Sequence, residues 1–246
     1  MNPINHIMPK LLKNIDLTTT ESEDVFKYLI SGEASDVEMA AFLSTLSMKG
    51  SSSDELAGAA KSLFPYVTNP LKLKINTIDI VGTGGDGLKT FNISTAVAFI
   101  VASLKKVYVA KHGNTAVSSK SGASDVLSEL GINISINDEL INKCLEKNNM
   151  CFLFAPNYNK AFKYVAKVRK ELIFRTIFNL LGPLLNPVRS KRQLLGVFSD
   201  NYVLTVAKTL KTLKSKKAWV VNGVDGMDEI TLTGISKVAE LNNNKI

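Results

Sequence analysis

From residue 77 onward, short apolar or β-branched runs alternate with helix-forming stretches, and this alternation constrains the fold more than any other feature. The predicted strands cover 77–81, 106–110, 150–154, 194–198 and 218–221. The predicted helices between them cover 94–104, 124–130, 160–181 and 202–213. Strands that alternate with helices indicate a mainly parallel α/β sheet joined by right-handed crossovers. Ligands of such sheets bind at the carboxyl ends of the strands, so the loop after each strand is a candidate site.

The first 69 residues carry a helical signal instead. Three Ser/Thr-x-x-Glu boxes each precede a short amphipathic stretch: Thr20 with Glu23, Ser35 with Glu38, and Ser52 with Glu55. In such a box, the hydroxyl and the carboxylate satisfy free backbone donors at the start of a helix. We therefore predict a small helical domain over residues 1–69 and a larger α/β domain over residues 70–246. We expect the helical stretch 160–187 to pack toward the small domain.

Composition limits the class of protein. Of the 246 residues, 45% are hydrophobic and 7% aromatic, which is enough for a packed core. No apolar run approaches the roughly 18 residues of a membrane-spanning helix, and the N-terminus lacks a secretory signal pattern. The two cysteines, Cys144 and Cys151, are too few for a disulfide framework or a metal-ligand set. These features predict a cytoplasmic protein with no membrane partner.

Positive charge is concentrated in one segment. The whole chain has 30 Lys and Arg against 22 Asp and Glu, a formal net charge of +8. Residues 188–217 oppose a single acid, Asp200, with eight basic residues: Arg189, Lys191, Arg192, Lys208, Lys211, Lys214, Lys216 and Lys217. A basic face of this kind can bind nucleic acid, but a solvated surface is the more common explanation. Nucleic acid is therefore not the expected partner.

A glycine-rich loop follows the first predicted strand. Residues 82–95 read GTGGDGLKTFNIST, with four glycines in the first six positions. Glycines let the backbone approach a ligand closely, and the loop ends at a helix start, where free N–H groups favour an anion. The loop therefore predicts a phosphate or pyrophosphate site, with a purely structural turn as the alternative. Dinucleotide and P-loop signatures both fail, because Lys111 stands where an acid is needed and Leu88 where a lysine is needed.

Three later segments carry further chemistry. Residues 111–125, KHGNTAVSSKSGASD, combine Lys111 with hydroxyls that can bind phosphate oxygens. Residues 168–183 hold Arg169 and Arg175; in a lysine-rich chain, arginine indicates a need for fork geometry, as for a carboxylate, with a surface salt bridge as the alternative. Asp228 and Glu229 follow the fifth predicted strand and suit Mg²⁺, although an ordinary Asp-Gly turn is also possible.

Together these motifs resemble the anthranilate phosphoribosyltransferase family. The matching segments are GTGGDG…NIST (82–95), KHGN…SS.SG..D (111–125), FLFAP (152–156), VR….RT.FN.LGPL.NP (168–187) and DG.DE (225–229). The family shares its architecture, a small helical domain against a larger α/β domain, with pyrimidine-type nucleoside phosphorylases. The resemblance implies Mg²⁺-dependent transfer of a phosphoribosyl group from 5-phosphoribosyl 1-diphosphate (PRPP) to the amine of anthranilate, releasing pyrophosphate, in tryptophan biosynthesis. It also implies a homodimer.

The resemblance further implies roles for individual residues. The PRPP site would comprise Gly82, Gly85, Asp86, Thr90, Asn92, Ile93, Ser94, Thr95, Lys111, His112, Gly113, Asn114, Thr115, Ala116, Val117, Ser118, Ser119 and Ala123. Anthranilate would bind Gly82, Asn114 and Arg169, with Arg169 facing its carboxylate, and Mg²⁺ would bind Ser94, Asp228 and Glu229. No residue is expected to act as a covalent nucleophile, because charge neutralisation and positioning of the amine supply the rate.

The sequence also departs from the family's usual pattern. Thr115 replaces an arginine, Asn159 and Asn222 replace histidines, and Ile173 replaces a glycine. Family members generally continue beyond the acidic motif, so we expect an incomplete α/β domain with a sheet edge and apolar surface left uncovered. Three alternatives stay open: a nucleic-acid-binding relative without the chemistry, a nucleoside phosphorylase, and an inactive remnant. Arg169 and the Gly182-Pro183 segment favour the anthranilate enzymes over the phosphorylases.

Overall fold

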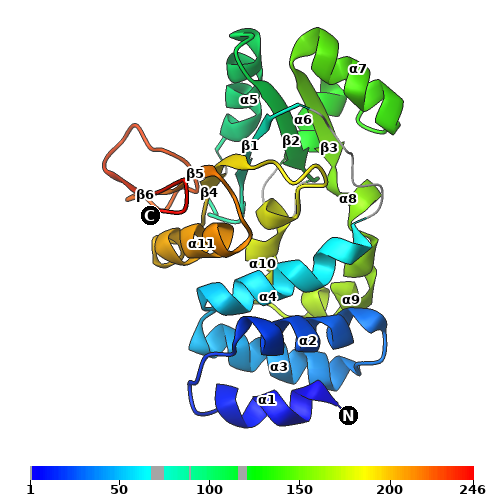
Figure 1. Ribbon diagram of the computed structural model, residues 1–246, viewed down its shortest axis with the longest axis vertical. Helices are drawn as coiled ribbons and strands as arrows, with labels where there is room; N and C mark the ends of the chain where they lie inside the picture. The colour runs from blue at the N-terminus through cyan, green and yellow to red at the C-terminus, as the bar shows by residue number, and fades with distance from the viewer. Residues whose placement is uncertain (1, 68–74, 89, 116–120) are drawn as a thin grey trace. The chain divides into compact units, whose positions relative to one another are not determined.

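A computed structural model describes residues 2–67, 75–88, 90–115 and 121–246 (Figure 1). The chain divides into two compact units. Unit 1 comprises Met1–Thr68 and Asn159–Leu185, and unit 2 comprises Asn69–Tyr158 and Asn186–Ile246. The α/β domain that we expected over residues 70–246 therefore contains a segment, 159–185, that the structure groups with the N-terminal helices. Unit 1 is helical and unit 2 is an α/β unit, which confirms the predicted fold class.

Unit 1 combines helices from two separate stretches of the chain. The N-terminal stretch forms α1 (Pro3–Leu11), α2 (Thr19–Ser31), α3 (Asp36–Lys49), α4 (Ser53–Leu63) and η1 (Phe64–Tyr66). The later stretch forms η2 (Lys160–Phe162), α9 (Lys163–Glu171), α10 (Phe178–Leu181) and η3 (Gly182–Leu185). The buried ring of Phe26 lies 5.6 Å from the rings of both Phe42 and Phe178, edge to face. The two stretches therefore share one aromatic core.

Two of the three predicted capping boxes are confirmed, at the starts of α3 and α4. The box at Thr20 was wrong, because α2 begins two residues earlier. The Thr18 hydroxyl accepts the Glu21 N–H at 3.2 Å, and the Glu21 carboxylate accepts the Thr18 N–H at 3.0 Å. In this register Glu21 also pairs with Lys10, and the buried Ser22 hydroxyl donates to the backbone oxygen of Glu55 at 2.6 Å. These contacts with residues distant in sequence favour the box of Thr18 and Glu21 over the overlapping box of Thr20 and Glu23.

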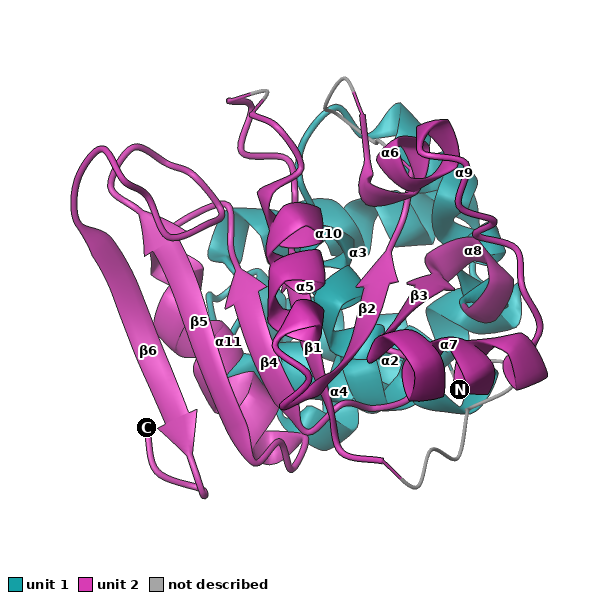
Figure 2. Ribbon diagram, turned by 90° about the horizontal axis from the view of Figure 1, so that it is seen from above, with its two compact units in different colours: residues 1–68, 159–185 teal, residues 69–158, 186–246 magenta. Residues whose placement is uncertain are grey.

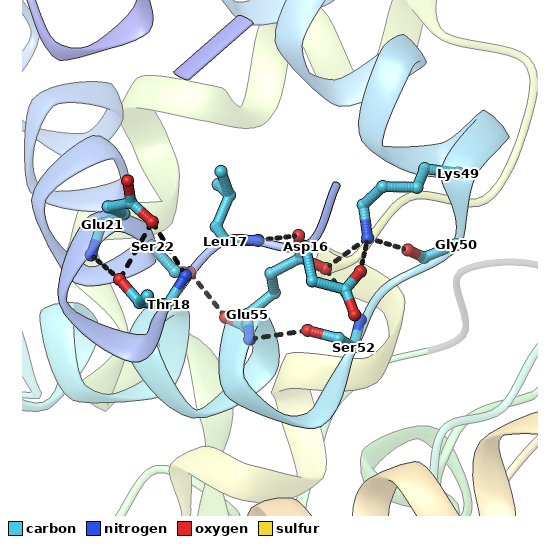
Figure 3. A network of polar contacts seen from close by, with 9 residues as sticks. All are labelled: Asp16, Leu17, Thr18, Glu21, Ser22, Lys49, Gly50, Ser52 and Glu55. Carbon is cyan, nitrogen blue, oxygen red and sulfur yellow. Dashed lines mark hydrogen bonds and ion pairs between the residues drawn. The ribbon is translucent and has the colours of Figure 1, made fainter. Parts of the chain in front are cut away.

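A buried carboxylate joins the helices of unit 1 (Figure 3). Glu55 is fully buried, and its carboxylate accepts the Leu17 N–H at 3.0 Å and the Ser52 N–H at 2.8 Å. Lys49 Nζ lies 3.0 Å from the same carboxylate and also pairs with Asp16. A buried charge is stable only when it is paired and hydrogen-bonded. This network therefore fixes the start of α4 against the segment that precedes α2 and the end of α3.

The predicted continuous helix over 160–181 was wrong, because the chain leaves the helical conformation after α9. Leu172 is extended, with φ −74° and ψ 115°. The Asn179 side chain accepts the Thr176 N–H at 2.9 Å, so a polar side chain satisfies a donor that a continuous helix would bond internally. A short helical turn, α10, then leads into the Gly-Pro segment of η3.

Unit 2 is built on a six-stranded sheet with the order β3-β2-β1-β4-β5-β6. The strands are β1 (Thr77–Gly82), β2 (Tyr108–Gly113), β3 (Met150–Phe154), β4 (Arg192–Gly196), β5 (Lys217–Gly223) and β6 (Ser236–Asn242). The first five are parallel, which confirms all five predicted strands, and β6 pairs antiparallel with β5. The order reverses direction between β1 and β4. In doubly wound sheets, this switch point is where ligands bind.

Helices cover both faces of this sheet. They are α5 (Ile93–Ser103), α6 (Ala123–Glu129), α7 (Asp138–Asn148), α8 (Ala155–Tyr158) and α11 (Asn201–Thr212). Figure 2 shows α5 and α11 on opposite faces. Under α5, a core of Ile80, Ala98, Ala102, Val109 and Met150 joins the helix to β1, β2 and β3. In the parts of the chain that the structure describes, no helix is both long and apolar enough to cross a membrane.

The strand β6 forms one edge of the sheet and was not predicted. Four of its seven residues are polar, and Leu241 is its one buried residue. On the opposite face, Trp219 of β5 is 45% exposed and Val238 of β6 is 44% exposed. This face of the β5–β6 pair therefore exposes two apolar side chains.

Candidate active site

The candidate site lies at the carboxyl ends of β1 and β4, where the strand order reverses. Gly82 ends β1 and pairs with Gly196, which ends β4. The acidic turn after β5 lies directly against these two glycines. A Cβ atom on Gly196 would lie 1.5 Å from the backbone oxygen of Asp228, and one on Gly82 would lie 2.4 Å from Asp228 Oδ2. Glycine at both positions therefore lets Asp228 reach the switch point.

The glycine-rich loop after β1 binds the Asp228 side chain through its backbone. The Gly84 N–H donates to Asp228 Oδ2 at 2.7 Å. Gly84 and Gly87 have φ values of +64° and +80°, in the left-handed region that side chains disfavour. The Thr83 N–H donates to the backbone oxygen of Gly196 at 2.9 Å, so the loop also continues the pairing with β4. These bonds hold the loop backbone over the strand ends.

Helix α5 begins at the same place. The Ser94 hydroxyl, in the first turn of α5, lies 3.2 Å from Lys111 Nζ, and the backbone N–H of Ser94 acts to lower the pKa of Glu229. Within the described residues, the Asn92 side chain donates to Ser121 Oγ at 3.0 Å rather than capping the helix. The structure therefore brings together Ser94, Lys111 and Glu229, which lie on three separate segments of the sequence.

Lys111 places a positive charge beneath the loop. Its side chain is 1% exposed, and Nζ donates to the backbone oxygen of Ile80 at 2.7 Å. Burial lowers the pKa of Lys111, and the charges of Asp79, Glu229 and Asp228 oppose that shift. The surrounding carboxylates therefore favour the protonated, charged form of Lys111 against the effect of burial.

The acidic turn carries negative charge in excess. Burial raises the pKa of Asp228 to about 6; the Gly84 N–H opposes this and the charge of Asp86 adds to it. Burial also raises the pKa of Glu229 to about 7, with repulsion from Asp228 adding to it and Lys111 opposing it. Raised values mean that the ionised forms are poorly compensated by the protein alone. A divalent cation would supply the missing compensation.

The residues at the turn fit a magnesium ion. The described residues contain no cluster of three or more His, Cys, Asp or Glu side chains arranged to enclose a metal. Mg²⁺ does not need one, because one or two carboxylates usually hold it while water and substrate phosphates complete the octahedron. Asp228, Glu229 and the Ser94 hydroxyl are hard oxygen donors of this kind.

The end of β2 supplies the second predicted loop. A Cβ on Gly113 would lie 2.6 Å from the Phe152 ring and 3.2 Å from Ala123 Cβ, so Gly113 allows close packing of β2, β3 and α6. Asn114 and Thr115 follow and are exposed, with the Thr115 N–H bonded to Asn114 Oδ1 at 2.8 Å. The predicted residues Ala116, Val117, Ser118 and Ser119 lie outside the described residues.

The other predicted residues of unit 2 lie in the first loop or the start of α5. Gly85 has a φ of +76°, and Asp86 accepts the Leu88 N–H at 3.1 Å. Thr90 is exposed just before the helix, whereas Ile93 is half-buried and Thr95 is buried in its first turn. His112 is buried on β2, and its backbone N–H donates to Asp79 Oδ1 at 3.0 Å.

Arg169 belongs to unit 1 and lies in the last turn of α9. Its guanidinium carbon is 5.6 Å from the centre of the Phe162 ring and 5.2 Å from that of Phe178. Burial lowers the pKa of Arg169, and no carboxylate among the described residues offsets this effect. Stacking on two rings orients the planar guanidinium group, which has the geometry for a bidentate contact with a carboxylate. Ile173, which replaces a usual glycine nearby, is 99% exposed.

Sequence reasoning missed two residues that shape the site. Gly196 was not singled out, although a glycine at the end of a predicted strand was an available signal. Asn222 was noted only as a departure; it is buried, and its Nδ2 donates to the backbone oxygens of Val197 at 2.7 Å and Met227 at 3.2 Å. It therefore braces the acidic turn against β4. The departure at Asn159 lies in unit 1, in an isolated bridge with Val67.

The sequence matches known proteins over both units. Residues 74–246 match the family model described as "Glycosyl transferase family, a/b domain", and residues 5–64 match that of the family's helical bundle domain. An anthranilate phosphoribosyltransferase of Clostridium kluyveri is 47% identical over 244 residues, which cover 99% of this chain and 72% of that protein. The two family models and this relative confirm the predicted glycosyltransferase class.

Two solved structures of anthranilate phosphoribosyltransferase from Saccharomyces cerevisiae are similar to this fold. The complex with PRPP and Mg has a TM-score of 0.86 and 30% identity, covering 97% of this chain and 72% of that one. The complex with 4-fluoroanthranilate has a TM-score of 0.84 and 28% identity, covering 99% and 70%. With nearly all of the chain matched at this level, the resemblance inferred from the motifs is confirmed. The chain belongs to the anthranilate phosphoribosyltransferase family.

Proposed function

We propose that the chain catalyses Mg²⁺-dependent transfer of the phosphoribosyl group of PRPP to the amine nitrogen of anthranilate. The observation that carries this proposal is the meeting of the glycine loop, the start of α5, Lys111 and the acidic turn at the β1–β4 switch point. The yeast relative that binds PRPP and Mg supports the same assignment. Residue roles follow those implied by the motifs.

The diphosphate of PRPP binds the loop after β1 in this proposal. Backbone N–H groups of a glycine loop and of a helix start are anion donors, and Lys111 adds a full charge. Asp228, Glu229 and Ser94 hold the magnesium ion. When bound, Mg²⁺ neutralises the charge that develops on the leaving pyrophosphate.

Transfer needs positioning more than covalent help from the protein. The bond between C1 of the ribose and the pyrophosphate oxygen breaks, the bond between C1 and the amine nitrogen forms, and the amine loses a proton to solvent. Arg169 takes the carboxylate of anthranilate through its planar fork. Fixing both substrates and stabilising the leaving charge are sufficient to account for large accelerations.

Loss of anthranilate fluorescence in the presence of PRPP and Mg²⁺ tests the proposal. The variant Asp228→Asn/Glu229→Gln keeps the shape of the turn but removes its charge, so we expect Mg²⁺-dependent turnover to disappear. Thermal unfolding should show a folded protein, because removing poorly compensated charges does not weaken the fold. Glu240→Gln, an exposed carboxylate on β6, is the control and should keep full turnover. Undiminished turnover in the double variant would contradict the assignment.

A further inference from the structure

The backbone ladder between β1 and β2 stops before the two strands end. Within the described residues, their register contains the pairs Thr77–Tyr108 and Ile78–Val109. Each strand pairs with its other neighbour over five residue pairs, which extend as far as Gly82 on β1 and Gly113 on β2. The interruption therefore lies at the edge of the sheet where the two predicted substrate loops begin.

A continued register would place Ile80 opposite Lys111. In a parallel ladder, the Ile80 N–H would then donate to the Ala110 oxygen, and the His112 N–H would donate to the Ile80 oxygen. Those four backbone groups must find other partners, because buried backbone groups are almost always hydrogen-bonded.

Side chains take up three of these four groups. Asp79 Oδ1 accepts the His112 N–H at 3.0 Å. On the other side of the gap, Asn186 Nδ2 donates to the Ala110 oxygen at 2.9 Å. The Ile80 oxygen accepts a hydrogen bond from Lys111 Nζ at 2.7 Å. Polar side chains have thus replaced most of the hydrogen bonds of one step of the ladder.

Asp79 and Asn186 form one unit within this gap. Asn186 Nδ2 also donates to Asp79 Oδ2 at 2.8 Å, and Asn186 Oδ1 accepts the Val188 N–H at 3.0 Å. Asp79 is fully buried and Asn186 is 3% exposed. Burying a carboxylate and an amide costs more than continuing a ladder, which requires no polar side chain. An arrangement that costs free energy and lies beside the ligand-binding edge of the sheet indicates that it serves the function of the protein.

We propose that Asp79 and Asn186 are positioning residues for PRPP, holding the end of β2 apart from β1. The inference rests on the proposed function. Neighbouring strands bonded directly lie roughly 4.8 Å apart, and a hydrogen-bonded side chain between them needs more room. The separation directs Lys111 under the first loop and sets where Asn114 and Thr115 leave the strand. Asp79 and Asn186 act through these residues and do not touch the substrate.

Asp79→Asn tests this role, because its new NH₂ group would face the Asn186 NH₂ donor. We expect PRPP binding, measured by calorimetry in the presence of Mg²⁺, to weaken by about tenfold or more, as for loss of a charged hydrogen bond. Hydrogen exchange of the His112 amide should accelerate. Thr77→Val is the matched control: it removes the buried 2.7 Å bond between the Thr77 and Ser190 hydroxyls, which joins β1 to the same 186–190 segment away from the loops. It should change PRPP binding by less than about twofold.

The outcomes separate the two proposals. If the unmodified chain does not bind PRPP, the proposed function itself fails. If the unmodified chain binds and Asp79→Asn binds equally well, the positioning role is overturned. Should Asp79→Asn not fold, Asn186→Ala replaces it, since this variant keeps the bond from His112 to Asp79. PRPP binding by Asn186→Ala no weaker than that by Thr77→Val would likewise overturn the role.

Discussion

Gly196 offers the sharpest structural test of how the acidic turn is placed. A Cβ at this position would lie 1.5 Å from the backbone oxygen of Asp228 and 2.5 Å from its carbonyl carbon. Carbon and oxygen atoms in contact stay about 3.3 Å apart, so in Gly196→Ala the turn must retreat by roughly 2 Å. Strand β4 cannot yield instead, because it is paired on both sides, with β1 and β5. The 2.7 Å bond from the Gly84 N–H to Asp228 would break.

The expected loss follows from that displacement. Misplacing a catalytic group by about 1 Å can cost on the order of a hundredfold in rate, so we expect kcat/KM of Gly196→Ala to fall at least that far. The Mg²⁺ concentration for half-maximal turnover should rise, because the carboxylates move with the turn. Crowding at a packed position should lower the free energy of unfolding by about 1–3 kcal/mol.

Steady-state anthranilate fluorescence against PRPP and Mg²⁺, together with urea unfolding, measures both effects. Val220→Ala is the control, because it opens a cavity at a fully buried position of β5 and also costs stability without crowding the turn. The control should keep kcat/KM within a few-fold of the unmodified chain. Turnover by Gly196→Ala equal to that of Val220→Ala would refute the placement of Asp228 over β4.

Three further predictions concern Arg169, the acidic pair and Glu55. Arg169→Lys should weaken anthranilate binding by roughly 1–3 kcal/mol in calorimetry and leave PRPP binding unchanged, because only the fork is lost; equal weakening of both would make Arg169 structural. Between about pH 4 and 7 the folded turn keeps protons that the unfolded chain has released, since the folded pKa values are about 6 for Asp228 and about 7 for Glu229 against 3.8 and 4.5. The Tm of the unmodified chain should therefore fall with rising pH relative to Asp228→Asn/Glu229→Gln, and parallel Tm curves would contradict this. Glu55→Gln breaks a buried pair with Lys49 and should lower the free energy of unfolding in urea by roughly 3–5 kcal/mol, and a loss below about 1 kcal/mol would show that the pair is dispensable.

Local sequence signals were sufficient for most of the sheet. Most residues of the five parallel strands are buried, and these strands therefore appear as apolar runs. The edge strand β6 gives no such signal, because it buries Leu241 and exposes most of its other side chains. Likewise, the N-cap of α2 is Thr18 rather than Thr20 because of contacts with residues distant in sequence. Local patterns do not contain that information.

The residues of the candidate site also divide into those that local motifs identify and those that only the fold reveals. Motifs identified Ser94, Lys111 and the acidic pair, because loops after parallel strands meet at one edge of the sheet. They did not identify Gly196, whose importance lies in a contact with Asp228, 32 residues later (228 − 196). The motifs did not identify Asp79 and Asn186 for a similar reason, because the partners of these side chains are backbone groups of another strand. Residues that act through tertiary contacts require the fold to be known.

Calorimetric titration of PRPP into the unmodified chain, with and without Mg²⁺, tests the central claim most directly. If the β1–β4 switch point is a Mg²⁺–PRPP site, binding should be tight with Mg²⁺ and at least about tenfold weaker without it, since two poorly compensated carboxylates then face the diphosphate. Asp228→Asn/Glu229→Gln should abolish the difference between the two titrations. Equal affinity with and without Mg²⁺ in the unmodified chain would contradict the account.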